Sequence, residues 1–171
     1  DLSVDHDWVR IALISDAHVS RSHVAAPFME ALDRIDAMVS AGDMASGGDI
    51  TAAAMQNQLL RTLSPLRGLT SKCLYGFAPG NHELRGTTPT WTPNDAMALL
   101  GSPTDQDYLG RWWSMDLGGK VHIAFINTGG GDPSTECLDW LETDLEGSAM
   151  PWRLVVGHSP AYGCPAGTVS G

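Results

Sequence analysis

The stretch Trp8-Val-Arg-Ile-Ala-Leu-Ile-Ser15 is a nearly continuous apolar run, and the polar residues Asp16-Ala-His18 follow it directly. A short run rich in isoleucine and valine predicts a β-strand that is buried on both faces. In open α/β sheets the loops at the carboxyl ends of the strands form the ligand crevice. The polar residues after this strand are therefore candidates for a functional site.

Helices and further strands alternate along the rest of the chain. Apolar residues at helical spacing predict helices over 26–36, from about 50 to 63 after a cap at Asp49, and from Ser134 to about 145. Residues 94–100 form a further short helix candidate in a loop-rich region. Strands are predicted over 37–40, 72–78 and 152–156, with a hairpin of 111–117 and 120–126. This order predicts a layered α/β fold.

Length and composition exclude several classes of protein. The chain has 171 residues with 10 Lys and Arg against 20 Asp and Glu, so its formal net charge is −10. This length suits one domain, and the acidic balance disfavours nucleic acid as a partner. No apolar run reaches the roughly 18–20 residues of a membrane helix. Three cysteines are too few for a disulfide scaffold. Cys137 and Cys164 are predicted to lie at the same edge of the sheet. They form either a disulfide, which would favour an extracytoplasmic location, or two free thiols.

Polar residues with metal-binding side chains follow four of the predicted strands directly. They are Asp16, His18, Asp43, Asn81, His82 and His158. Asp and Asn also favour turns, so each alone could simply cap a turn. Four strand ends that all deliver such side chains to one edge instead favour a common site.

Mixed carboxylate, amide and imidazole ligands suit zinc, manganese or iron. A two-metal site needs a carboxylate that bridges both ions, and Asp43 is the natural candidate because it leaves the central strand. Asp16 and His18 would then serve one metal, while Asn81 and His158 would serve the other. His82 follows a ligand directly, which can place it over the pocket as a proton donor or phosphate partner.

Four motifs in this order resemble those of the calcineurin-like metallophosphoesterases. They are Asp16-Ala-His18, Gly42-Asp43, Gly80-Asn-His-Glu83 and Gly157-His158. The later stretch 136–162 is similar to purple-acid-phosphatase-like members. The resemblance implies a layered α-β-β-α sandwich with two metal ions, which hydrolyses phosphate esters, in particular monoesters, by a metal-activated water. It also supports the metal ligands named above, with His82 as the catalytic group and Glu83 as a residue that orients its neighbours.

Two departures from the family pattern bear on this expectation. Ser46 stands where the purple enzymes carry tyrosine, and His18 stands where they carry glycine, so a purple iron–tyrosinate centre is not expected. The family's closing Gly-His-x-His motif is absent, which leaves each metal one histidine short. We therefore expect a single catalytic domain, 1–171, that is truncated or cleaved before this motif. A C-terminal segment or a second chain would complete it.

The alternative is a catalytically impaired relative that serves as a structural or interaction subunit. The missing motif favours this alternative, whereas the six retained residues favour the enzyme. Among the other histidines, His122 lies within a strand and is expected to be structural or on the surface. Trp112 and Trp113 are adjacent in a strand, so one should face the core and the other should face away.

Overall fold

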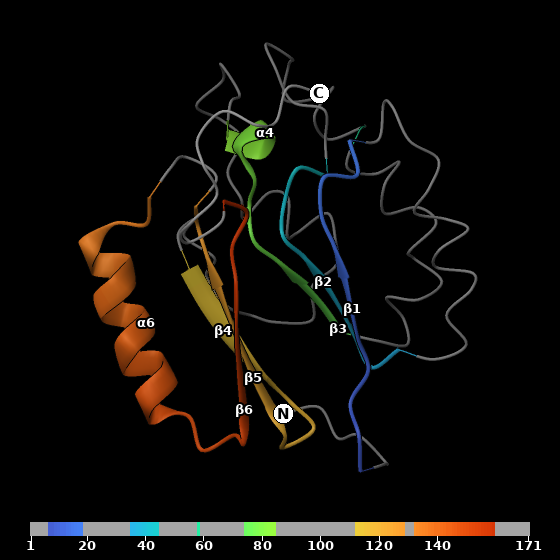
Figure 1. Cartoon of the computed structure of the whole chain (residues 1–171), viewed down its shortest axis with the longest axis vertical. Coiled ribbons are helices and arrows are strands. Elements are labelled where there is room, and N and C mark those ends of the chain that lie inside the picture. The colour runs from blue at the N-terminus through green and yellow to red at the C-terminus, as the bar shows by residue number, and fades with distance from the viewer. Residues whose placement is uncertain are drawn as a thin grey trace.

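The computed structural model of the chain describes residues 7–18, 35–44, 58, 74–84, 112–128 and 132–159. These residues form two three-stranded sheets, in the orders β1-β2-β3 and β4-β5-β6 (Figure 1). The strands are β1 (Ile11–Ile14), β2 (Ala37–Ser40), β3 (Leu74–Phe77), β4 (Trp112–Leu117), β5 (Val121–Ile126) and β6 (Trp152–Val156). Strands pair in parallel except in the β4–β5 hairpin. The helices whose bounds fall within the described residues are α4 (Asn81–Leu84) and α6 (Thr135–Gly147).

One apolar cluster lies between the two sheets and includes residues of all six strands or their ends. The indole of Trp113 stacks on the ring of Phe125 with the centroids 4.2 Å apart, and its Nε1–H donates to the carbonyl of Phe77 at 3.2 Å. A Cβ at Gly76 would overlap the ring of Phe125, so only glycine lets β3 approach β5 this closely. The layered arrangement expected from the sequence is confirmed.

Alternation along β4 decides which side chains enter this core. Trp113, Met115 and Leu117 are buried between the sheets, whereas Trp112, Ser114 and Asp116 lie on the opposite face. The expectation that only one of the paired tryptophans faces the core is confirmed. Helix α6 covers this opposite face (Figure 1), where the rings of Trp112 and Trp140 lie 6.2 Å apart.

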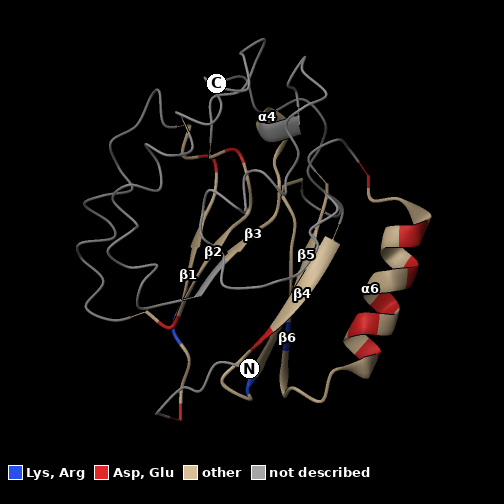
Figure 2. Ribbon diagram, turned by 180° about the vertical axis from the view of Figure 1, so that it is seen from behind, with Lys and Arg blue, Asp and Glu red and all other residues tan. Residues whose placement is uncertain are grey.

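Helix α6 begins where the sequence predicted, because the Ser134 side chain accepts a hydrogen bond from the Cys137 backbone N–H. At its other end, Arg153 Nη2 donates to the carbonyl of Ser148 at 2.7 Å and places a positive charge at the helix C-terminus. Acidic residues are spread along the helix, and others lie beyond the ends of β1 and β2 (Figure 2). On this helix Leu138 is 49% exposed, and Cys137 is the buried residue.

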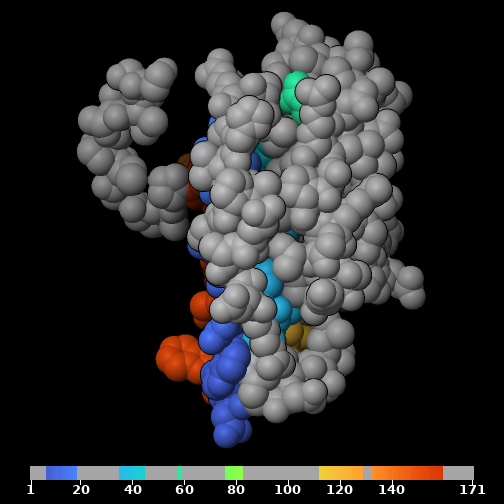
Figure 3. Space-filling model, turned by 90° about the vertical axis from the view of Figure 1, so that its right-hand side faces the viewer, coloured from blue at the N-terminus to red at the C-terminus, as the bar shows by residue number. Residues whose placement is uncertain are grey.

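The expectation that the first strand is buried on both faces is wrong. Leu13 is 62% exposed, because β1 is the outermost strand of its sheet among the described residues. Seen from the side, the segment that carries β1 (blue) reaches the surface at the lower end of the molecule (Figure 3). A continuous apolar run is also compatible with an edge strand, so periodicity alone could not distinguish the two.

Several expectations lie outside the described residues. The predicted helices over 26–36, 50–63 and 94–100 fall there, with three exceptions. Ile35 and Asp36 are described and are not helical, whereas Gln58 is described and is helical.

Cys137 is a free thiol, and burial raises its pKa despite an opposing hydrogen bond to the backbone of Asn127. Cys164 is not described. Within the described ranges, no helix is long and apolar enough to cross a membrane.

Candidate metal centre

The loops that follow β1 and β2 run side by side at the carboxyl edge of their sheet. The backbone pairing of the strands continues into these loops, from Ala41 N–H to the carbonyl of Ile14, from Asp16 N–H to that of Gly42, and from His18 N–H to that of Asp43. These bonds are 2.9–3.1 Å long. Asp16, His18 and Asp43 are therefore fixed by backbone hydrogen bonds and not only by their side chains.

Three of the candidate ligands adopt a backbone conformation that L-residues rarely use. Their φ angles are +54° at Asp16, +40° at His18 and +52° at Asp43. Each left-handed residue costs on the order of 1 kcal/mol or more, and such strain is characteristic of functional sites. Among the described non-glycine residues these are the only three with positive φ. The strain is thus confined to the proposed site.

Two glycines make the close approach of these loops possible. Gly42 has φ +93°, and a Cβ there would overlap the backbone of Gly80. In turn, a Cβ on Gly80 would overlap the backbone and carboxylate of Asp43. The glycine before each ligand in the second and third motifs is therefore required by the contact between the loops after β2 and β3.

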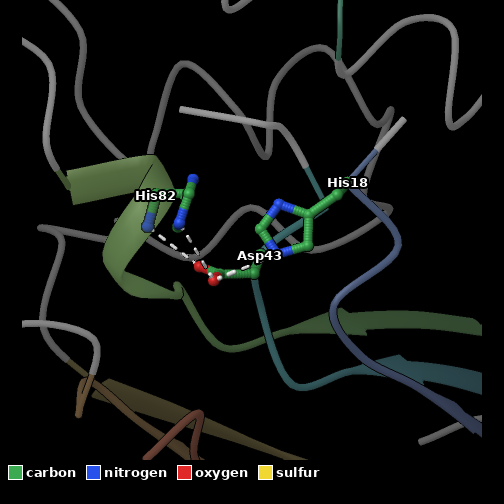
Figure 4. A group of neighbouring side chains, drawn as sticks. All are labelled: His18, Asp43 and His82. Atoms are coloured by element: carbon green, nitrogen blue, oxygen red, sulfur yellow. Dashed lines mark hydrogen bonds and ion pairs between the residues drawn. The ribbon is translucent and has the colours of Figure 1, made fainter. Parts of the chain in front are cut away.

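Asp43 is the centre of the cluster and its side chain is almost fully buried. Its Oδ1 accepts a hydrogen bond of 2.9 Å from the backbone N–H of His82, the second residue of α4. Its Oδ2 lies 3.3 Å from Nε2 of His158, 3.6 Å from Nε2 of His18 and 3.8 Å from Nε2 of His82. Figure 4 shows His18 and His82 reaching this carboxylate from the end of β1 and from α4.

Asp16 lies at the exposed side of the cluster. Its Oδ1 is 3.9 Å from Nε2 of His18, and its Oδ2 accepts a hydrogen bond from the Ser15 hydroxyl. The rings of His18 and His82 meet edge to face with centroids 4.6 Å apart. Asp16 is more than half exposed, so this side of the cluster is accessible from solvent.

His158 is held from both sides of its ring. Its Nδ1–H donates to the carbonyl of Ala41 at 2.9 Å. A carbonyl only accepts, so this bond places a proton on Nδ1. On the other side of the ring, Nε2 lies 3.0 Å from Oδ1 of Asn81 and 3.3 Å from Oδ2 of Asp43. An imidazole nitrogen, an amide oxygen and a carboxylate oxygen that converge in this way could hold a cation.

The described side chains form two groups with the geometry of a metal site, and both contain Asp43. One consists of His18, Asp43 and His82, and the other of Asp16, Asp43 and His158; within each, the ligand atoms lie within 4.8 Å of one another. These groups contain five of the six residues singled out from the sequence, and the contact between Asn81 Oδ1 and His158 Nε2 brings in the sixth. Glu83 belongs to α4, and its side chain is outside the description.

No sequence pattern pointed to the carbonyl of Ala41, because backbone groups carry no residue-type signature. None pointed to α4 either, since four residues are too few to show helical periodicity. Both features act on predicted ligands, by orienting the ring of His158 and by bringing the His82 N–H to Asp43.

A second histidine–carboxylate cluster lies apart from this site, between the outer face of β4–β5 and α6. His122 is buried and hydrogen-bonds through Nδ1 to Asp116 Oδ1 and through Nε2 to Asp144 Oδ2, both at 2.7 Å. The Ser114 hydroxyl donates to the other oxygen of Asp144 at 2.8 Å. Burial alone lowers the pKa of His122, but the hydrogen bonds and charges of the two aspartates outweigh it and raise the pKa. This histidine is structural, as expected.

A carboxylate-centred cluster at the strand ends of a layered α/β sandwich defines a metal-binding class of proteins. The family model of the calcineurin-like phosphoesterases matches residues 9–169, and the chain belongs to this family. It is therefore a metal-dependent phosphoesterase in the general sense of the family. The fold is also similar to the crystal structure of the phosphopantetheinyl hydrolase from Mycobacterium tuberculosis, with a TM-score of 0.48 and 16% identity over 89% of this chain and 68% of that one. No curated protein matched.

Proposed function

We propose that this chain hydrolyses phosphate monoesters at a centre of two metal ions that share Asp43. The observation that carries the proposal is the convergence on Oδ2 of Asp43, where imidazole nitrogens from three separate segments lie within 3.8 Å. A carboxylate approached from several sides is the ligand that a pair of ions about 3.5–4 Å apart requires. The hydrogen bond from the His82 N–H to Oδ1 supports this role because it fixes the carboxylate plane.

The proposed ligands divide into two half-sites around this bridge. Asp16 and His18 serve one ion, and Asn81 and His158 serve the other. Nε2 of His18 lies 3.9 Å from Oδ1 of Asp16, and Nε2 of His158 lies 3.0 Å from Oδ1 of Asn81. Zinc, manganese or iron suits such ligands, and these ions supply Lewis acidity toward the phosphate and toward a nucleophilic water.

His82 is proposed as the catalytic group that protonates the leaving oxygen or stabilises its developing charge. Its backbone is held by Asp43 while its side chain remains partly exposed next to the edge of His18. A histidine that is anchored through its backbone can keep its ring available to a substrate. We propose that Glu83, the next residue of α4, orients these neighbours.

The preference for monoesters rests on the similarity of the region around α6 and β6 to purple-acid-phosphatase-like members. The iron–tyrosinate pair of the purple enzymes is not part of the proposal, because Ser46 and His18 stand at the two diagnostic positions. The second candidate is an impaired protein that binds partners without turnover. We retain the expectation of one catalytic domain, and the two candidates make opposite predictions for metal content and hydrolysis.

The deciding experiment combines metal analysis with hydrolysis of p-nitrophenyl phosphate and bis(p-nitrophenyl) phosphate. We expect two ions per chain and faster turnover of the monoester. Asp43→Asn keeps an acceptor for the His82 N–H but removes the charge, so it should lower kcat/KM by about 100-fold or more. Asp139→Asn, an exposed carboxylate change on α6, is the matched control and should leave turnover unchanged. A metal-free, inactive wild type would refute the proposal, and faster diester turnover would refute its substrate preference.

A further inference from the structure

Thr128 lies two residues beyond β5 and is buried, with only 5% of its surface exposed. It binds Ser159 through two groups at once. Its Oγ1 accepts from the Ser159 backbone N–H at 2.8 Å, and its carbonyl accepts from the Ser159 hydroxyl at 2.8 Å. A buried threonine that fastens one residue twice fixes the path of that residue's backbone.

The other neighbour of His158 also lies against Thr128. A Cβ on Gly157 would meet Oγ1 of Thr128 at 3.0 Å, which is tighter than most Cβ contacts, so the backbone of Gly157 passes close to this hydroxyl. The three-residue loop Gly157-His158-Ser159 is thus packed around Thr128 at both ends. His158 is the residue between them.

This support is independent of the hydrogen bond at the ring itself. The Ala41 carbonyl fixes the rotation of the His158 ring through Nδ1, whereas Thr128 fixes where the backbone of that residue lies. With both supports in place, Nε2 lies 3.0 Å from Asn81 Oδ1 and 3.3 Å from Asp43 Oδ2. A displacement of about 1 Å is enough to disrupt a reactive site.

We propose that Thr128 is a positioning residue that sets the place of His158 in its half of the metal centre. The inference rests on the proposed function, since it assumes that His158 is a metal ligand. Thr128 does not touch the cluster, so it acts only through the loop it fastens. Groups that orient metal ligands typically change metal affinity by about 10–100-fold when they are lost.

The test is Thr128→Val, which keeps the shape of the side chain and removes the hydroxyl. We expect the affinity for Mn²⁺ in calorimetric titration to fall about 10–100-fold at one of the two sites, with the other site nearly unchanged. Thr128→Ser restores the hydroxyl and should return the affinity to within about threefold. Thr143→Val makes the same change at an exposed residue of α6, whose hydroxyl bonds the Asp139 carbonyl, and should leave metal binding unaltered.

A second readout separates positioning from loss of stability. In metal-free protein, the ¹⁵N spectrum of the His158 ring should show a hydrogen-bonded Nδ1–H in the wild type and a changed Nδ1 chemical shift in Thr128→Val, because the ring moves relative to the Ala41 carbonyl. If Thr128→Val does not fold, Ser159→Ala removes one of the two bonds and should give the same changes at smaller size. Wild-type Mn²⁺ affinity and an unchanged His158 spectrum in a folded variant would overturn the proposal, as would failure of Thr128→Ser to restore binding.

These readouts do not depend on turnover. A wild type that binds Mn²⁺ without hydrolysing aryl phosphates would defeat the proposed function, while the change in affinity would still support or overturn the role of Thr128. A wild type that binds no metal would overturn both.

Discussion

Replacement of His122 by phenylalanine should destabilise the protein most at low pH. His122 bridges Asp116 and Asp144 with two hydrogen bonds of 2.7 Å, and phenylalanine keeps the bulk of the ring without either bond. A hydrogen bond to a charged group contributes about 1.5–3 kcal/mol when it is buried. The Asp144 side chain is 18% exposed, so its hydrogen bond to His122 contributes the full amount of about 1.5–3 kcal/mol. The Asp116 side chain is 42% exposed, and because solvent screens its charge, its hydrogen bond contributes less than about 1 kcal/mol.

The expected loss is therefore about 2–3 kcal/mol near pH 6. For a chain of this length, 1 kcal/mol corresponds to roughly 2–4 °C in Tm, so Tm should fall by roughly 4–12 °C. The folded state raises the pKa of His122 above its ordinary 6.5, which means that the protonated ring binds more favourably in the folded chain. The stabilisation is complete below pH 6.5 and is lost as the pH rises through the folded-state pKa. The difference between wild type and His122→Phe should shrink accordingly toward pH 9.

The measurement is urea denaturation of both proteins from pH 5.5 to 9 in the presence of EDTA, so that metal binding does not contribute. Because the other titrating groups are common to both chains, they cancel in the difference. Asp144→Asn should remove most of the pH dependence of this difference. A penalty that is constant, or that grows with pH, would show that the ring is neutral in the folded state and would refute the reasoning.

Three further substitutions test the packing and the site. Gly80→Ala should cost at least about 2 kcal/mol of unfolding free energy and abolish metal binding, because the new methyl group overlaps Asp43; near-normal calorimetric titration would contradict the close-approach argument. Gly147→Ala, where nothing lies within 4 Å, should raise the unfolding free energy by about 0.5–1 kcal/mol, and a lower Tm would speak against it. Trp113→Phe should cost about 1–3 kcal/mol, since the Phe77 carbonyl loses its indole donor; an unchanged urea midpoint would argue that this bond is unimportant.

The strands were predicted best where burial is most uniform. The predicted bounds of β2, residues 37–40, are those observed, because all four residues are buried between neighbouring strands and polar or glycine residues follow them. The burial of β1 was predicted wrongly, since an apolar run gives no information about the position of a strand within its sheet. Helix α4 was missed because it depends on tertiary contact with Asp43 and not on its own periodicity.

The convergence of the candidate ligands could be predicted because it follows from topology. Side chains after parallel strands arrive at one edge, so Asp16, Asp43 and Asn81 were expected to meet before any distance was known. What could not be predicted is the support of these side chains. The bond of His158 to the Ala41 carbonyl and the two bonds of Thr128 to Ser159 join residues that lie far apart in the chain, and one partner in each of these three bonds is a backbone group.

The left-handed backbone at Asp16, His18 and Asp43 has a consequence for the evolution of the family. Glycine at any of these positions would relieve strain, so selection for stability alone would favour replacing all three. If these side chains bind the metal ions as proposed, they persist only while that chemistry is under selection. In related chains that have lost activity, these three positions should be among the first to drift toward glycine or asparagine, and their state offers a simple way to separate working members from decayed ones.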